Sequence, residues 1–135
     1  MTYKIEEIQG IGPAFAEKLS AAGITTTSDM LALCCTDTGR QKVAAKTGLS
    51  VSQILKWTNM ADLMRVAGIG PQFSELLEYV GVDTIKELRQ RNGANLAAKM
   101  FEINEDKHLS GSAPAEKTVQ AWIDSAKKLD SLISY

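Results

Sequence analysis

The strongest constraint on the fold is a segment that occurs twice in the sequence. Residues 8–30 align without a gap on residues 66–88, and nine of the 23 aligned positions are identical. Both copies contain the tetrapeptide Gly-Ile-Gly-Pro, at residues 10–13 and at residues 68–71. An internal match of this length is hard to obtain by chance, and it predicts a duplicated structure with pseudo-two-fold symmetry.

The repeat continues beyond these segments. Trp57 aligns with Trp122 when the offset between the copies increases from 58 to 65 residues, so the second copy has gained seven residues. We place the insertion at residues 104–113, a polar stretch with glycine and serine that is typical of a surface loop. The predicted units span residues 1–65 and 66–135. We expect them to dock into one compact domain, because no flexible linker separates them.

Each Gly-Ile-Gly-Pro segment predicts a sharp turn that leads into a helix. Glycine tolerates backbone angles that other residues avoid, and proline suits the first helical position, where its missing N–H is not needed. We therefore expect helices to begin at Pro13 and Pro71. Gly23 and Gly81 stand where a glycine in the left-handed conformation ends a helix.

The remaining sequence predicts helices and no strands, which gives an all-α fold class. Ser50-x-x-Gln53 and Thr84-x-x-Glu87 have the pattern of a capping box, which marks the start of a helix. Apart from the helix that follows Thr84, shorter helices are predicted at residues 28–35, 39–46 and 94–103.

Two longer amphipathic helices are predicted from about Ser50 and from about Pro114. We expect the first to continue through Val66 into the second turn. The last helix keeps an apolar period from Val119 to Ile133, so its tryptophan and that of the first long helix are expected in the core.

Several further segments carry a resemblance to a known family. Besides the two turns, these are Gly39-Arg40, Lys46-Thr47-Gly48, Lys56-Trp57, Ala61-Asp62-Leu63-Met64-Arg65, Gly81-Val82-Asp83-Thr84, Glu87-Leu88-x-x-Arg91-Asn92 and Trp122-Ile123. The turns resemble the helix-hairpin-helix motif, and the whole chain is similar to a bacterial family of tandem helix-hairpin-helix proteins, the domain-of-unknown-function 4332 family. The resemblance implies two tandem helix-hairpin-helix units with accessory helices, in the SAM-domain-like fold class.

The helix-hairpin-helix resemblance also implies binding of the DNA backbone without sequence specificity. Amide N–H groups of such a turn lie at the positive end of a helix dipole and can donate to a phosphate oxygen. The implied phosphate-binding residues are Gly10, Gly12, Ala14, Phe15 and Lys18 at the first turn, and Gly68, Gly70, Gln72 and Phe73 at the second. The resemblance permits a monovalent cation on the carbonyls of a turn, and no other cofactor is expected.

The distribution of charge weakens this implication. The chain has 15 Lys and Arg and 16 Asp and Glu residues, so its net charge of -1 draws no polyanion to the molecule as a whole. Ala14 and Gln72 stand where DNA-binding motifs of this type commonly carry Lys or Arg. The carboxylates nearest the turns are Glu6, Glu7, Glu17, Glu75 and Glu78. The best basic cluster, which is either a binding patch or a set of solvated helix faces, consists of Arg40, Lys42, Lys46, Lys56 and Arg65.

The sequence contains no recognisable catalytic motif. His108 is the single histidine, and the adjacent Cys34 and Cys35 have neither Cys-x-x-Cys spacing nor a favourable geometry for a disulfide. We therefore expect no metal site and no enzymatic activity. No signal peptide or long apolar run is present, which predicts a cytoplasmic protein that does not enter a membrane.

Two functions of different classes remain open. The first is a non-catalytic scaffold or protein–protein interaction module, with a protein partner or self-association. The alternative is weak, non-specific binding of a nucleic-acid backbone through the amides of the turns.

Overall fold

The computed structural model describes residues 2–135, and in this part of the chain all regular structure is helical apart from one isolated β-bridge between Lys4 and Thr26. The all-α prediction is confirmed. A short 3-10 helix, η1 (Ile5–Glu7), precedes the α-helices, which in chain order are α1 (Pro13–Ala21), α2 (Thr27–Cys34), α3 (Asp37–Thr47), α4 (Val51–Leu63), α5 (Pro71–Val80), α6 (Ile85–Leu88), α7 (Gly93–Lys107) and α8 (Glu116–Lys127).

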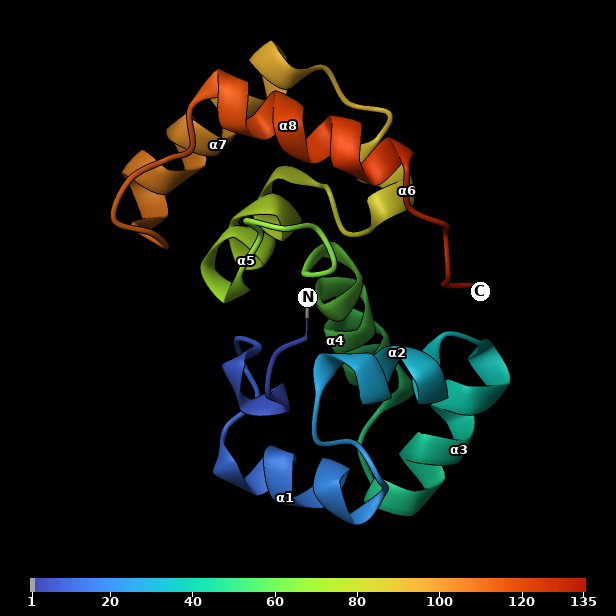
Figure 1. Cartoon of the computed structure of the whole chain (residues 1–135). Coiled ribbons are helices and arrows are strands. Elements are labelled where there is room, and N and C mark those ends of the chain that lie inside the picture. The colour runs from blue at the N-terminus through green and yellow to red at the C-terminus, as the bar shows by residue number, and fades with distance from the viewer. Residues whose placement is uncertain (1) are drawn as a thin grey trace.

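Helix α4 joins the two groups of helices. Figure 1 shows α1, α2 and α3 on one side of the molecule and α5, α6, α7 and α8 on the other, with α4 running from the first group into the second. Every residue from Trp57 to Leu63 is buried. A helix segment that is buried all round lies in the interior, so the second half of α4 is the centre of the fold.

The buried apolar side chains form two clusters. The first gathers residues from Ile5 to Met64, and the second gathers residues from Leu63 to Ala126. Leu63 and Met64 are neighbours in sequence but belong to different clusters, so the clusters meet at the end of α4. Removal of these side chains from water is the main driving force for the fold.

Both helices that follow a Gly-Ile-Gly-Pro turn begin where the sequence predicts. Pro13 is the first residue of α1 and Pro71 is the first residue of α5. Gly23 and Gly81 follow these helices with φ angles of +88° and +96°, in the left-handed region that favours glycine. The prediction of a glycine stop is confirmed at both positions.

The capping boxes are formed in part as predicted. Ser50 and Gln53 make the reciprocal bonds of a capping box at the start of α4. Thr84 accepts the amide of Glu87 at 3.3 Å, but the Glu87 carboxylate pairs with Arg91 at 3.2 Å instead of returning to the cap. The second box is therefore half formed.

Helix α2 starts with a capping box that the sequence analysis missed. The hydroxyl of Thr26 accepts the amide of Asp29, and the Asp29 carboxylate accepts the amide of Thr26. The same carboxylate accepts the amide and the hydroxyl of Thr25, and these bonds hold the pKa of Asp29 below its ordinary value. These bonds fix the start of α2 at Thr27, one residue before the predicted position.

The prediction of a loop at residues 104–113 is wrong for its first four residues, which are helical. Helix α7 continues to Lys107, and His108 then takes the left-handed conformation, with φ of +52°. Asn104 is buried inside the helix, where its side chain donates to the carbonyl of Ser110 and accepts the amide of the same residue. The polarity of Asn104 predicts a loop, but this residue lies in α7 and its side chain holds the loop at Ser110.

Both longer helices end earlier than predicted. Helix α4 ends at Leu63, and Val66 lies in the turn that follows. Helix α8 ends at Lys127, and Ile133 packs against the first cluster rather than continuing the apolar face of α8. The apolar period was misleading here because the chain changes from one core to the other after Leu129, which packs on the second cluster.

Candidate functional site

The first Gly-Ile-Gly-Pro turn is open to solvent. Gly10 has a φ angle of +93°, Ile11 is buried, and Gly12 is the N-cap residue of α1 with an extended backbone. A Cβ atom added at Gly12 would meet no atom within 4 Å. Within residues 2–135 no backbone carbonyl accepts the Gly12 amide, so this turn offers a free donor at a helix N-terminus.

The second turn has a similar backbone and is more covered. Gly68 has a φ angle of +94°, and Gly70 is the N-cap residue of α5. Gly70 is half-buried, and a Cβ atom there would lie 3.9 Å from the Oη atom of Tyr3. Tyr3 and Glu7 line a groove together with Gly68, Gly70 and Gln72. The N-terminal segment therefore lies beside the second turn.

A tryptophan lies next to the first glycine of each turn. A Cβ atom at Gly10 would lie 3.6 Å from Nε1 of Trp57, and one at Gly68 would lie 2.9 Å from Nε1 of Trp122. Both indole side chains are 3% exposed, which confirms their predicted place in the core. At Gly68 this distance is too short for a Cβ atom, whereas at Gly10 it is an ordinary contact and the positive φ angle is what favours glycine.

Each of these tryptophans also packs against a phenylalanine in the helix that begins at its turn, Trp57 against Phe15 of α1 and Trp122 against Phe73 of α5. Phe15 and Trp57 have ring centroids 5.4 Å apart with an interplanar angle of 52°, and Phe73 and Trp122 have values of 5.2 Å and 53°. Such tilted pairs are favourable beyond the apolar area that they bury. Each turn is thereby held between a helix start and a buried indole.

Carboxylates lie close to both turns. A groove beside α1 is lined by Ile11 and Pro13 of the first turn and by the charged residues Lys4, Glu6 and Glu17. The groove beside the second turn contains Glu7. A phosphate at either turn would approach at least one carboxylate, and this repulsion opposes binding of a polyanion.

The remaining phosphate-binding candidates give little support. Ala14 and Gln72 are exposed but carry no charge. Lys18 is exposed in the last turn of α1, and the helical rise places it about 9 Å along the axis from Gly12. Its ammonium group is nearer the negative end of the helix dipole than the amides that would hold the phosphate.

Arg40 does not belong to a surface patch. Its side chain is 2% exposed, and its guanidinium donates to the carbonyls of Cys34 at 2.9 Å and Ser134 at 2.6 Å. Arg40 shares a face of α3 with the buried Val43, three residues later, and this spacing was the signal that it points inward. The prediction that Arg40 is part of a basic patch is wrong for this reason.

The other basic candidates are separated from one another. Lys56 pairs with Glu78 at 3.6 Å, and Arg65 pairs with the buried Asp62 at 2.9 Å. Lys42 and Lys46 are exposed on α3, and within residues 2–135 neither has a carboxylate at ion-pair distance. These two lysines are what remains of the predicted patch.

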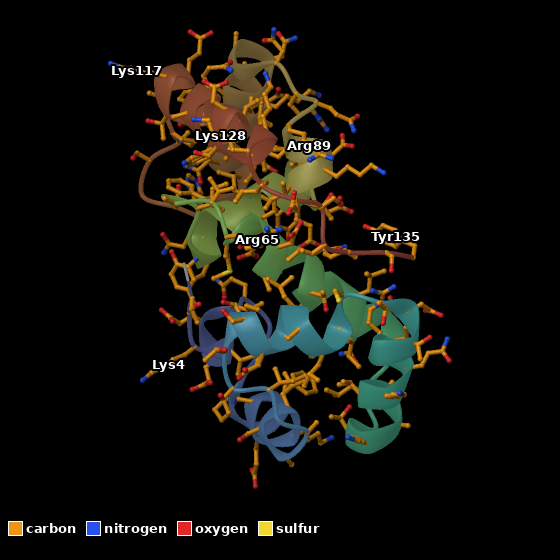
Figure 2. The ribbon with its side chains drawn as sticks, turned by 45° about the vertical axis from the view of Figure 1, so that its right-hand side comes forward. Lys4, Arg65, Arg89, Lys117, Lys128 and Tyr135 are labelled. Atoms are coloured by element: carbon orange, nitrogen blue, oxygen red, sulfur yellow. The ribbon has the colours of Figure 1, made fainter. Side chains whose placement is uncertain are left out.

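Basic side chains elsewhere are also spread over the molecule. Figure 2 shows Lys4 beside the first group of helices, while Lys117, on α8, and Lys128, directly after α8, lie in the second group. Arg65 lies between them, in the middle of the molecule. These four basic side chains are therefore spread over both groups of helices and the region between them.

A cleft of about 280 Å³ lies between α4 and the residues around α5. Its lining includes the ion pair of Lys56 and Glu78 and the apolar side chain of Leu55. Asn59, which is 9% exposed, also lines the cleft, and its Oδ1 atom has no hydrogen-bond partner within residues 2–135. Burial raises the pKa of Glu78, and Lys56 opposes this rise.

The described residues contain no cluster of three or more His, Cys, Asp and Glu side chains that could hold a metal ion. Among these residues no helix combines the length and apolar character that crossing a bilayer requires.

The two cysteines are free and are expected to differ in reactivity. Cys34 is buried, and burial raises the pKa of its thiol to about 11, whereas Cys35 is half-buried. Iodoacetamide at neutral pH is therefore expected to modify Cys35 in the folded protein and both cysteines after denaturation, as measured by peptide mass mapping. Equal modification of both thiols in the folded protein would contradict the buried position of Cys34.

Asp62 is a structural residue that the sequence analysis did not single out. The residue is 2% exposed, and its carboxylate pairs with Arg65 through Oδ1 and accepts the amide of Ile85 through Oδ2 at 2.9 Å. It thus ties the end of α4 to the start of α6. Its place one residue before the buried Leu63 was the available signal, because a carboxylate inside an apolar run needs a partner.

Comparison with known protein families identifies a family for most of the chain. The family described as Domain of unknown function (DUF4332) matches residues 9–129. The matched range contains both turns, both tryptophans and Arg40. No curated protein and no solved structure matches the chain.

Proposed function

Since this chain belongs to the DUF4332 family, whose description assigns no function, we propose from its own geometry that it is a non-catalytic scaffold or protein-interaction module. We further propose that it consists of two tandem helix-hairpin-helix units related by duplication. A protein partner or a second copy of the chain is the expected ligand.

Matched geometry at the two turns supports the proposed duplication. The φ angles of Gly10 and Gly68 differ by one degree, at +93° and +94°. The two pairs of phenylalanine and tryptophan rings differ by 0.2 Å in separation and by 1° in angle, from the values of 5.4 Å and 52° and of 5.2 Å and 53°. Such agreement between two segments of one chain is expected when both descend from one unit.

The close approach of each turn to an indole carries the proposal that the turns are structural. The left-handed backbone angles explain both Gly10 and Gly68 without any ligand, and at Gly68 the short distance to Trp122 is a further reason. Binding of a nucleic-acid phosphate at the turns would also require basic side chains beside these glycines. Instead Arg40 is buried, Lys56 and Arg65 are paired, and carboxylates line the grooves beside both turns.

The open amide of Gly12 favours the alternative function, which is weak binding of a nucleic-acid backbone. Anisotropy of a labelled DNA duplex, titrated at low and at moderate salt, separates the two proposals. For an interaction module we expect weak binding at most, with no change in Gly12→Asp. Aspartate is a favourable N-cap residue, so this variant should fold while placing a carboxylate at the free donor.

The opposite result would support nucleic-acid binding. Affinity that falls steeply with salt and is lost in Gly12→Asp would show that a phosphate sits on the first turn. Gly12→Ala is the matched control, because it changes the same open position without adding charge.

The interaction function itself is tested by light scattering and by affinity capture. We expect either self-association that increases with protein concentration or a stoichiometric protein partner. A monomer at every concentration that captures no protein would contradict the proposal.

A further inference from the structure

The segment after α8 connects the second group of helices to the first. We call residues 129–135 the C-terminal strap. The strap has no helix or strand, and it runs from the end of α8 back toward α2 and α3 (Figures 1 and 2). Leu129 packs on the second apolar cluster and Ile133 packs on the first, so the strap contacts both.

Three arginines from different segments hold the backbone of the strap. Arg89 donates to the carbonyl of Leu129 at 3.3 Å, and Arg65 donates to the carbonyl of Asp130 at 2.9 Å. Arg40 donates to the carbonyl of Ser134 at 2.6 Å. These contacts recognise carbonyl oxygens, which every peptide carries, and not the side chains of the strap.

Arg40 is the most deeply placed of these three residues. Its guanidinium donates to the carbonyl of Cys34 as well as to that of Ser134, and the centroid of the Tyr135 ring lies 5.9 Å from the guanidinium carbon. The amide of Ser134 donates to the carbonyl of Cys35 at 2.8 Å. A buried guanidinium needs acceptors in place of water, and one of its two acceptors here belongs to the strap.

Apolar contacts accompany the polar ones. Ile133 packs against the first cluster, and Leu132 lines a groove that also includes Leu31 and Ala32 of α2. Arg65 lines the same groove. The surface under the strap therefore combines aliphatic contacts with arginine donors aimed at a peptide backbone.

We infer that this surface, which we call the strap seat, is a binding site for an extended peptide, with the C-terminal strap as its occupant within the chain. The seat is formed by Arg40, Arg65, Arg89, Leu31, Ala32 and Cys35. It fits a peptide that has an aliphatic residue at the place of Ile133 and an aromatic residue at the place of Tyr135. The inference rests on the proposed interaction function and specifies the chemistry of the partner.

The test uses the full chain with the strap released by Ile133→Glu. A labelled peptide with the sequence of residues 129–135, Leu-Asp-Ser-Leu-Ile-Ser-Tyr, is titrated and followed by anisotropy. We expect Ile133→Glu to bind it at least about tenfold more tightly than the unaltered chain, whose own strap competes at high effective concentration. Ser131→Glu adds the same charge at an exposed position and should bind like the unaltered chain.

Hydrogen exchange of the Ser134 amide reports whether the strap has left its seat. We expect faster exchange in Ile133→Glu, with unchanged near-ultraviolet circular dichroism from the two buried tryptophans. A second peptide with serine in place of the isoleucine should bind less tightly than the first.

Two results would overturn the inference. The first is that the strap of Ile133→Glu is released but this variant does not bind the peptide. The second is that the Ser134 amide stays protected from exchange in this variant, because the seat would then not require an aliphatic residue at position 133. Neither result bears on the proposed interaction function, which is judged by light scattering and capture with the unaltered chain.

Discussion

Gly68→Ala is expected to lower the free energy of unfolding by about 2–4 kcal/mol. Two effects contribute. The φ angle of +94° is unfavourable for alanine, and the added Cβ atom would lie 2.9 Å from Nε1 of the buried Trp122. Urea unfolding followed by far-ultraviolet circular dichroism measures the loss.

The other glycines of the turns supply the controls. Gly10→Ala has a similar unfavourable φ angle of +93° but a longer Cβ distance of 3.6 Å, so we expect a smaller loss than at Gly68. Gly12→Ala meets no atom within 4 Å and has a normal φ, so its loss should be only a few tenths of a kcal/mol to about 1 kcal/mol. Equal losses at Gly12 and Gly68 would contradict the packing role of Gly68.

Asp62→Ala is expected to lower the free energy of unfolding by about 2–4 kcal/mol. The substitution leaves the amide of Ile85 without its acceptor inside the protein and removes the partner of Arg65. Arg65 keeps the carbonyl of Asp130, which limits the loss. The same urea unfolding measurement applies.

Two variants separate the carboxylate contacts from general effects of substitution. Asp62→Asn keeps an oxygen that can accept the amide of Ile85, so it should be less destabilising than Asp62→Ala. Asp130→Ala removes an exposed carboxylate and should change stability by no more than about 0.5 kcal/mol. A neutral effect of Asp62→Ala would contradict the link between α4 and α6.

The parts of the fold that could be predicted are those decided by neighbouring residues. Pro13 and Pro71 start helices because of their own ring geometry, and Gly23 and Gly81 end them because of their φ angles. The burial of the tryptophans followed from apolar spacing. These signals act within one or two helical turns, so they can be read without knowing which elements pack together.

The strap and its hydrogen bond to the buried Arg40 could not be predicted, because they depend on contacts between distant residues. Arg40 and Ser134 are 94 positions apart, and nothing near either residue indicates the hydrogen bond between them. Ile133 continues the apolar period of α8 but packs on the other cluster. A periodic pattern shows that a residue will be buried, not which surface will bury it.

The candidate site shows the same limit. The positions of the glycines in the turns followed from the repeat, and the cluster of five basic residues was predicted from their proximity in the chain. Arg40 is buried, and Lys56 and Arg65 are paired with carboxylates, so three of the five add no unpaired positive charge to the surface. Glu78 is 22 positions from Lys56 in the sequence, so the ion pair depends on how α4 meets α5.

The most direct test of the proposed function is an NMR titration of the folded chain with a DNA duplex at low salt. The amide signals of Gly10, Gly12, Gly68 and Gly70 report on both turns in one experiment. If the turns are packing elements of an interaction module, these four signals should stay in place as duplex is added. Shifts of the Gly10 and Gly12 signals that saturate with added duplex and reverse when salt is added would contradict this packing role, and would assign the first turn to phosphate binding.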